Sequence, residues 1–247
     1  MIKKVIKYFL PNFFLKYLKK ILIFKRLFKY KRLSNEDIFR DIYNNKLWSP
    51  EEEEKHLKFY SGTGSHLKEF KNIYFKHIKE FLLQFNFKLN AVDLGCGDFS
   101  IGSEIRKYCG KYIAIDVFDD LIDYNKKFYK NYDVDFKVLD ITKDELPKGD
   151  ICFLRQVLQH LSNENIKKFL NQMKGKYKYL VLTEHLPDNK IFEPNIDIVT
   201  GPFIRLDKKS GVDLLANPFN LKAIEVKDVC NIRPKKIKGF EGVVNTK

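Results

Sequence analysis

The sequence predicts an α/β protein with a mostly parallel β-sheet, helices on both faces and a C-terminal antiparallel hairpin. From residue 90 onward, short apolar segments rich in β-branched and aromatic residues alternate with helical segments, as in parallel strands joined by crossover helices. The glycine-rich stretch "DLGCGDF" at 93–99 links a strand to a helix, so it lies at the carboxyl edge of the sheet. Ligands of open α/β sheets bind at that edge.

The expected elements divide the chain into three parts. Residues 1–34 form a basic aromatic segment, 35–89 a helical cap or lid, and 90–247 the sheet domain, in which 186–216 is an insertion near the ligand edge. Ser34 and Asp37 have capping-box spacing and predict a helix over 35–44. Further elements are expected as strands over 90–94, 111–116, 134–139, 150–155 and 178–184, helices over 72–85, 99–108, 119–129 and 163–173, and a hairpin of 221–229 with 235–244.

The positive charge of the chain is concentrated at its N-terminus. The net charge is +14, and residues 1–35 contribute eleven of these charges without a single acid, which leaves +3 for 36–247. The nearly neutral body carries no basic stripe, so we expect no nucleic-acid partner. Cys96, Cys109, Cys152 and Cys230 form no C-x-x-C pair, which predicts free thiols in a reducing compartment and no metal site.

The N-terminal segment has the pattern of an amphipathic helix. Its apolar side holds Phe13, Phe14, Tyr17, Ile21, Phe24 and Phe28, and its basic residues lie largely away from that side. No apolar run is long enough to span a bilayer, and lysines interrupt any secretory signal. We expect residues 1–33 to lie on an anionic membrane surface, which makes the protein cytoplasmic and peripheral on the inner face of the cytoplasmic membrane. A packing helix, for example across a dimer, and RNA contact are the alternatives; the oligomeric state is open.

The turn at 93–99 carries acids where a phosphate-binding turn would not. It lacks the third glycine of a dinucleotide fingerprint and the Gly-Lys-Ser/Thr of a P-loop. Asp93 and Asp98 would repel a pyrophosphate but suit a cationic amine, such as the amino-acid end of S-adenosylmethionine. The second strand ends in Asp116, where an acid accepts hydrogen bonds from ribose hydroxyls. The third ends in Asp140 and Ile141, placed to meet an adenine edge; turn or helix capping is the ordinary alternative for these acids.

At these residues the sequence resembles the class I S-adenosylmethionine-dependent methyltransferases, which have a Rossmann-like sheet. "DLGCGDF", "YIAIDVFDDLI", "VLDIT" and "GDICFLRQVLQHLS" look like their first four motifs, over residues 90–184. "IYNNKLWS", "SGTGS", "NIDIVTGPFIRLD" and "NPFNL" look like a bacterial subfamily associated with surface-polysaccharide and small-molecule modification. The resemblance implies S-adenosylmethionine as cofactor. It also implies the cofactor-binding residues, which are Asp93, Gly95, Gly97, Asp98, Asp116, Val117, Asp140, Ile141, Arg155 and Gln156.

Methyl transfer to an alcohol needs alignment and a general base. His160 follows the fourth strand and His185 the fifth, and in this fold those strands are neighbours. We expect His160 as the base, with His185 or Glu184 orienting the acceptor; packing under the next helix or a loop hydrogen bond is the ordinary alternative for each histidine. On the acceptor side we expect Asp197, Thr200 and Arg205, with Arg205 suited to a phosphate or carboxylate. A surface ion pair is its alternative role.

The function expected from these observations is O-methylation of a sugar or sugar-linked group in a bacterial cell-envelope glycan or its precursor. A soluble small-molecule acceptor is the nearest alternative. RNA methylation and a non-catalytic membrane-associated scaffold are further alternatives. The "SGTGS" stretch at 61–65 is expected to be a mobile lid over the cofactor or a plain turn.

Overall fold

The computed structural model describes residues 12–49, 58–189, 191–233 and 243–247, and its fold is the one the sequence predicts. Seven strands form one sheet in the order β3-β2-β1-β4-β5-β7-β6. The first five are parallel neighbours, and β7 pairs antiparallel with both β5 and β6. The strands are β1 (Ala91–Leu94), β2 (Tyr112–Asp116), β3 (Asp135–Val138), β4 (Ile151–Arg155), β5 (Tyr179–Leu186), β6 (Cys230–Ile232) and β7 (Val243–Thr246).

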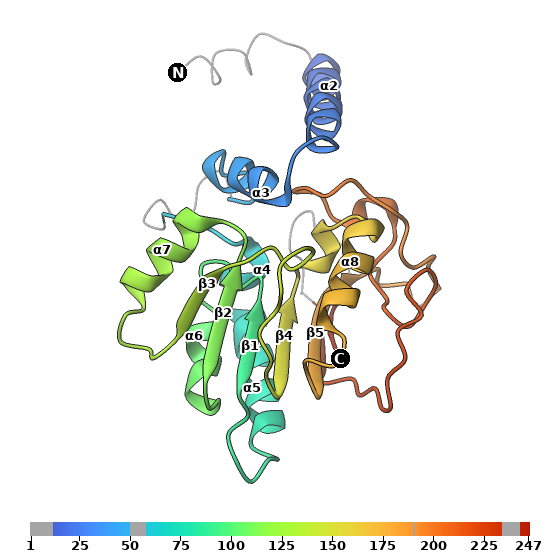
Figure 1. The fold of residues 1–247 in the computed structure, drawn as a ribbon. Coiled ribbons are helices and arrows are strands. Elements are labelled where there is room, and N and C mark those ends of the chain that lie inside the picture. Colours follow the sequence, from blue (N-terminus) through green and yellow to red (C-terminus); the bar gives the residue numbers. More distant parts are fainter. Residues whose placement is uncertain (1–11, 50–57, 190, 234–242) are drawn as a thin grey trace.

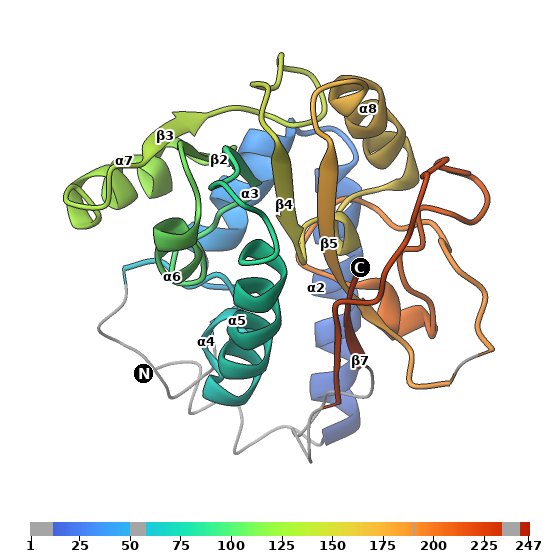
Figure 2. The same cartoon turned by 90° about the horizontal axis from the view of Figure 1, so that it is seen from below.

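Helices cover both faces of the sheet, as Figures 1 and 2 show. Strand side chains alternate between two cores: Phe153 packs with α5 on one face, and Leu154 packs with α8 on the other. The cores therefore use successive residues of the same strands, which is why these strands read as continuous apolar runs. The α-helices are α2 (Asn12–Tyr30), α3 (Asn35–Asn44), α4 (Thr63–His66), α5 (Lys68–Leu82), α6 (Gly102–Ile105), α7 (Asp119–Phe128) and α8 (Asn163–Met173); 3-10 helices are η1 (Arg106–Tyr108), η2 (Leu158–His160) and η3 (Arg205–Lys208).

The N-terminal helices lie beyond the carboxyl ends of the strands. The Ser34 hydroxyl accepts a hydrogen bond from the Asp37 N–H and starts α3, as the capping-box spacing predicts. Helix α2 stands farther out, and Lys29 and Tyr30 tie its last turn to Asp41 of α3. Tyr30 is buried against Ile38 and Ile42, so α2 is held to α3 at one end.

Two sequence predictions of secondary structure are wrong in position. The helix expected over 99–108 begins only at Gly102, because Phe99 has φ +60° and is buried against Tyr112 and Phe136 as part of the preceding turn. The hairpin exists, but its first strand is Cys230–Ile232 instead of 221–229. Most of the second predicted segment, 235–242, lies outside the described residues, and its strand is Val243–Thr246.

Candidate active site

The glycine turn after β1 is tied to the end of β2 by its backbone. The N–H groups of Gly95 and Cys96 donate to the Ile115 carbonyl at 2.8 Å, and the Gly97 N–H donates to the Asp116 carboxylate at 3.0 Å. Gly95 and Gly97 have φ of +73° and +56°. A Cβ at Gly95 would lie 2.4 Å from a Val157 methyl carbon, and one at Gly97 would lie 2.3 Å from the Ser61 hydroxyl. The turn therefore requires glycine for both conformation and space.

Two buried carboxylates lie near the carboxyl ends of neighbouring strands, Asp93 within β1 and Asp116 as the last residue of β2. Asp93 is 7% exposed and accepts a bond from the Tyr112 hydroxyl at 3.0 Å, and Asp116 is 7% exposed with backbone donors only. Burial raises the pKa of Asp93 to about 7 and that of Asp116 to about 6. Because burial outweighs their hydrogen bonds, both groups would gain from a cation placed beside them.

Asp140 at the end of the third motif is already engaged in a different network. Its carboxylate accepts bonds from the backbone N–H and the hydroxyl of Thr142 at 2.9 and 2.7 Å. The Asn35 side chain, in the first turn of α3, donates to both of its oxygens at 3.1–3.2 Å. The acid thus joins α3 to the sheet edge, a contact that no local pattern around Asn35 signalled.

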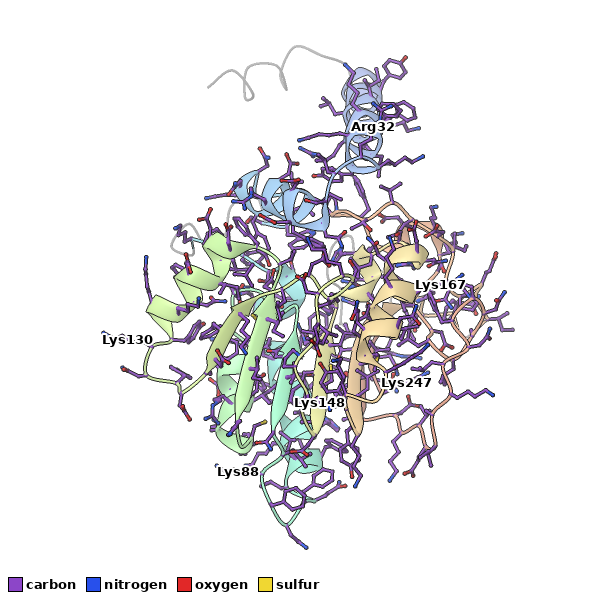
Figure 3. All side chains as sticks on the ribbon, in the orientation of Figure 1. Arg32, Lys88, Lys130, Lys148, Lys167 and Lys247 are labelled. Carbon is purple, nitrogen blue, oxygen red and sulfur yellow. The ribbon has the colours of Figure 1, made fainter. Side chains whose placement is uncertain are left out.

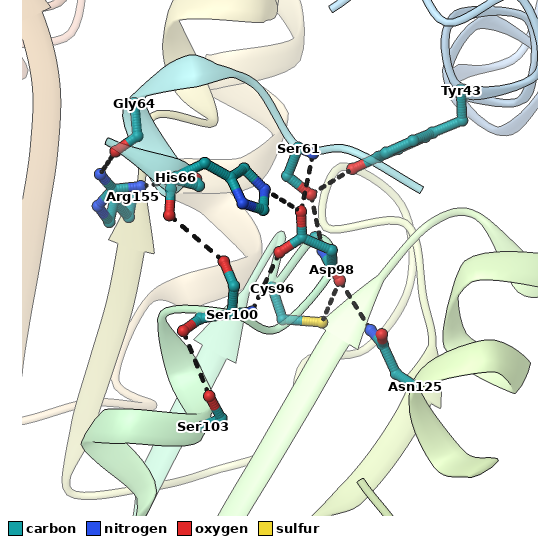
Figure 4. Close-up of polar contacts among 12 residues, drawn as sticks. Tyr43, Ser61, Gly64, His66, Cys96, Asp98, Ser100, Ser103, Asn125 and Arg155 are labelled. Atoms are coloured by element: carbon teal, nitrogen blue, oxygen red, sulfur yellow. Dashed lines mark hydrogen bonds and ion pairs between the residues drawn. The ribbon is translucent and has the colours of Figure 1, made fainter. Parts of the chain in front are cut away.

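Asp98 holds the 61–66 segment against the glycine turn (Figure 4). Its carboxylate accepts the Ser61 N–H at 2.9 Å and contacts His66 Nε2 at 2.7 Å. Burial alone would raise the pKa of Asp98, but the bonds from His66, Ser100 and Ser61 outweigh burial and hold it below its ordinary value. Its observed contacts are with this segment, so cofactor binding by Asp98 stays a prediction.

Arg155 holds the same segment from the other side. Its guanidinium donates to the Gly64 carbonyl at 2.6 Å and to the Ser65 hydroxyl at 2.9 Å, and it lies over the Tyr74 ring. Gln156 follows in a left-handed conformation with φ +58°, and its amide nitrogen lies 2.9 Å from His185 Nε2. The segment "SGTGS" is therefore anchored at both ends in this structure, and its role as a lid stays a prediction.

One cavity of about 470 Å³ brings most of the predicted site together. All ten residues predicted to bind the cofactor line it, together with His160 and His185. Glu184, Asp197, Thr200 and Arg205 do not line it, although Glu184 was expected to orient the acceptor and the other three to contact it. Residues that line the cavity and that sequence reasoning did not place there are Asn35, Phe39, Tyr43, Trp48, Ser61, Gln159 and Asp207.

Both histidines of the cavity are neutral. Burial lowers the pKa of His160 to about 4 and that of His185 to about 3. His160 Nδ1 lies 3.3 Å from the Phe203 carbonyl, which can only accept, so Nδ1 carries the proton and Nε2 the lone pair. The Gln159 amide nitrogen lies 3.2 Å from that Nε2, and the Trp48 ring centroid lies 4.7 Å from the imidazole centroid.

The four predicted residues outside the cavity bond to the backbone around His160. Glu184 accepts two N–H groups, Arg205 donates to carbonyls, and Thr200 and Asp197 accept the N–H groups of Ser162 and Asn163. Arg205 is 1% exposed, so the surface ion pair considered for it is wrong. This geometry does not favour direct contact between these four residues and the methyl acceptor.

Among the described residues, no group of three or more His, Cys, Asp or Glu side chains could hold a metal ion. All four cysteines are free. No helix in the described part of the chain is long and apolar enough to cross a membrane.

Comparison with known proteins agrees with this fold. Residues 92–178 match the model of a family described as a methyltransferase domain. Among solved structures, the N-methyltransferase NodS from Bradyrhizobium japonicum WM9 shares 14% identity with a TM-score of 0.54, over 72% of this chain and 95% of that one. A second NodS structure, in complex with S-adenosyl-L-homocysteine, shares 15% identity at TM-score 0.44, over 51% and 66%.

Magnesium protoporphyrin IX methyltransferase from Synechocystis PCC 6803, with bound SAH, shares 14% identity at TM-score 0.44, over 62% of this chain and 73% of that one. The chain spans 66%, 50% and 60% of the lengths of the first three structures it matches. No curated protein matches the chain. The similarity to NodS at TM-score 0.54 supports the fold and nothing beyond it.

The matched residues make up about a third of this chain, and the shared fold agrees with a methyltransferase-type domain in that region. The residues present fit S-adenosylmethionine, the cofactor that the sequence resemblance implies. The glycine turn leaves no room for a Cβ, and burial raises the pKa values of Asp93 and Asp116 at the cavity wall. A cationic nucleoside satisfies both features. Asp93 and Gly97 would hold its methionine end and Asp116 its ribose.

Proposed function

We propose that the protein O-methylates a sugar or sugar-linked hydroxyl, as a methyltransferase of the bacterial cell envelope. The proposal rests on the part of the cavity lining that is aromatic instead of acidic. Beside the carboxylates, the cavity has an aromatic wall of Trp48 next to His160, whose Nε2 carries a lone pair. Aromatic faces suit the apolar face of a sugar ring, and a neutral imidazole suits a hydroxyl proton.

S-adenosylmethionine, when bound, supplies an activated methyl group, so the residues of this chain have to align and deprotonate the acceptor. His160 accepts the hydroxyl proton at Nε2 in place of the Gln159 amide N–H that faces it, and its low pKa keeps the imidazole unprotonated at neutral pH. The Trp48 indole N–H donates to the Pro202 carbonyl at 3.2 Å, which fixes the ring at this wall. Asp207 lines the same cavity and offers a carboxylate to further hydroxyls.

The envelope location rests on helix α2. Tyr17, Leu22, Phe24 and Phe28 are 53–71% exposed on it, and Lys20, Lys25, Lys29, Lys31 and Arg32 are exposed around them. Figure 3 shows the side chains of α2 extending away from the domain. The side chains of Phe13, Phe14, Lys16 and Lys19, and residues 1–11, lie outside the described part. An exposed face with aromatics and without acids matches an anionic lipid surface, where each basic residue contributes about 1 kcal/mol.

Two experiments test the proposal. Mass spectrometry of envelope glycans from cells with and without the active gene should show one methyl group lost; an unchanged glycan profile would favour the soluble small-molecule acceptor. Flotation of the full chain with vesicles of anionic lipid should carry the protein upward. The variant Phe24→Ser/Phe28→Ser should float less, and Phe87→Ser, an equally exposed phenylalanine beyond α5, should float like the wild type.

A further inference from the structure

The backbone of residues 158–163, here called the His160 turn, is held by side chains that lie behind the cavity. Glu184, in β5, accepts the Leu158 N–H at 3.0 Å on one carboxylate oxygen and the Gln159 N–H at 3.1 Å on the other. Glu184 is 3% exposed, and both N–H groups belong to a 3-10 helix too short to satisfy them itself.

Arg205 holds the opposite side of the same peptide groups. One of its terminal nitrogens donates to the carbonyls of Leu158 and Gln159 at 3.0 and 3.3 Å. The other donates to the Leu161 carbonyl and to the Asn163 side-chain oxygen, both at 2.8 Å. The Glu184 carboxyl group therefore faces the N–H end of the turn, and the guanidinium faces the carbonyl end. Burial raises the pKa of Glu184 to about 8, above its ordinary value.

Residues 200–203, which belong to the insertion 186–216, make further contacts with the His160 turn and with His160 itself. The Gly201 N–H donates to the His160 carbonyl at 2.9 Å, and the Phe203 carbonyl faces the imidazole Nδ1. Thr200 accepts the Ser162 N–H at 2.9 Å. Residues 197–205 therefore follow the His160 turn along its length, and the imidazole is fixed in one tautomer at the cavity wall.

We propose that Glu184 and Arg205 are positioning residues that act through the backbone of the His160 turn to keep the His160 imidazole in its Nδ1–H tautomer at the cavity wall, with the Nε2 lone pair beside the Gln159 amide nitrogen. The importance of that lone pair rests on the proposed function. The positioning of the His160 turn itself rests on the hydrogen bonds that Glu184 and Arg205 make to its backbone. It replaces the direct roles that the sequence favoured for Glu184 and Arg205.

The test is the tautomer of His160, read from the imidazole nitrogen shifts of the ¹⁵N-labelled full chain and assigned with His160→Asn. The wild type should show a single neutral form with the proton on Nδ1 from pH 8 to pH 5.5. Arg205→Ala should show a mixture of tautomers. Removing the Arg205 charge also moves the His160 pKa, and so would a change at the neighbouring His185 or Glu184. The measurement that decides the test is therefore the tautomer of His160 and not the midpoint of its titration.

Arg205→Lys and Glu184→Gln separate geometry from charge and serve if Arg205→Ala does not fold. Lysine keeps the positive charge but lacks the two terminal nitrogens of the guanidinium, and glutamine has one accepting oxygen instead of two. Both variants should therefore also show a mixture of His160 tautomers. Arg106 likewise donates to backbone carbonyls, but these belong to Asp133 and Cys109 and not to the His160 turn, so Arg106 is the matched control, and Arg106→Ala should keep the single form.

Affinity for S-adenosylmethionine should stay within about twofold of the wild type in the Glu184, Arg205 and Arg106 variants, because none of these three residues lines the cavity. A single Nδ1–H tautomer in Arg205→Lys and Glu184→Gln would overturn the proposal. The readout requires no methyl acceptor, so a failure to find methyl transfer leaves this result standing.

Discussion

The cofactor edge and the acceptor side of the cavity are built from the same kinds of residue in opposite ways. At the cofactor edge, the buried acids Asp93 and Asp116 line the cavity, and burial raises their pKa values to about 7 and about 6. On the acceptor side, Glu184 and Arg205 are equally buried but face backbone groups outside the cavity. Burial also raises the pKa of Glu184 to about 8, so a raised pKa marks a candidate ligand site only for a group that also lines the cavity.

The difference also separates what each region requires of a ligand. The acids of the cofactor edge face the cavity, whereas the charged groups behind the His160 turn face its backbone. We expect changes at the cofactor edge to alter affinity strongly and changes around the His160 turn to alter it little.

The largest effect is expected at the glycine turn. Gly95→Ala should lower S-adenosylmethionine affinity by at least about 100-fold, because its Cβ would lie 2.4 Å from Val157, and a left-handed alanine costs about 1–2 kcal/mol in addition. Gly175→Ala is the matched control, since Gly175 has φ +68° but nothing within 4 Å of a Cβ. Calorimetric titration and thermal unfolding of both variants separate lost binding from backbone strain. Equal affinities in the two variants would show that the turn does not contact the cofactor.

The next effect is expected at Asp116. Asp116→Ala should weaken S-adenosylmethionine binding by about 1.5–3 kcal/mol, or about 10- to 150-fold, the usual worth of hydrogen bonds to a charged group. Asp119→Ala is the control, because Asp119 begins α7, pairs with Arg40 and does not line the cavity. Calorimetry measures both, and an unchanged affinity in Asp116→Ala would place the ribose elsewhere.

A smaller effect is expected from pH. The pKa values of Asp93 and Asp116 are about 7 and about 6 in the free protein, so both are protonated below these values and a bound cation favours their ionised forms. Affinity for S-adenosylmethionine should therefore fall as pH is lowered from 7 to 6, by about tenfold in total if both acids are fully coupled to binding. Calorimetry in two buffers of different ionisation enthalpy should show proton release on binding. Asp93→Asn should flatten the profile, and a flat profile in the wild type would contradict the electrostatic fit.

The smallest effect is expected at the 61–66 segment. His66→Ala removes its contact with Asp98 but not the Arg155 contacts, so affinity should fall only about two- to tenfold, mostly through faster cofactor dissociation. His77→Ala, which removes a bond to the Ile73 carbonyl within α5, should change neither rate. Stopped-flow displacement measures both, and an unaltered dissociation rate in His66→Ala would mean that the segment is not a lid.

The sheet could be predicted because its signals are local. Alternating strands and helices, the glycine turn and the acid at each strand end all lie within short windows, and the structure brings them to one edge. The start of the helix after the turn could not be placed, because Phe99 takes a left-handed conformation that its burial against Tyr112 supports and its sequence does not announce.

The acceptor side could be predicted only in part. The sequence singled out His160, Glu184 and Arg205, and the structure does bring them together. Their orientation depends on contacts between segments 25 to 47 residues apart, such as Arg205 with Leu158, so a pattern in one segment cannot show which groups face the cavity and which face the backbone. The contact of Asn35 could not be predicted for the same reason, since its partner Asp140 is 105 residues away.

The most direct test of the account is a calorimetric titration of the full chain with S-adenosylmethionine at pH 7.5, beside the Asp116→Ala variant. The account predicts one binding site per chain in the wild type and a weaker one in the variant. An absence of binding heat at millimolar ligand across several temperatures, or equal affinity in both proteins, would contradict it.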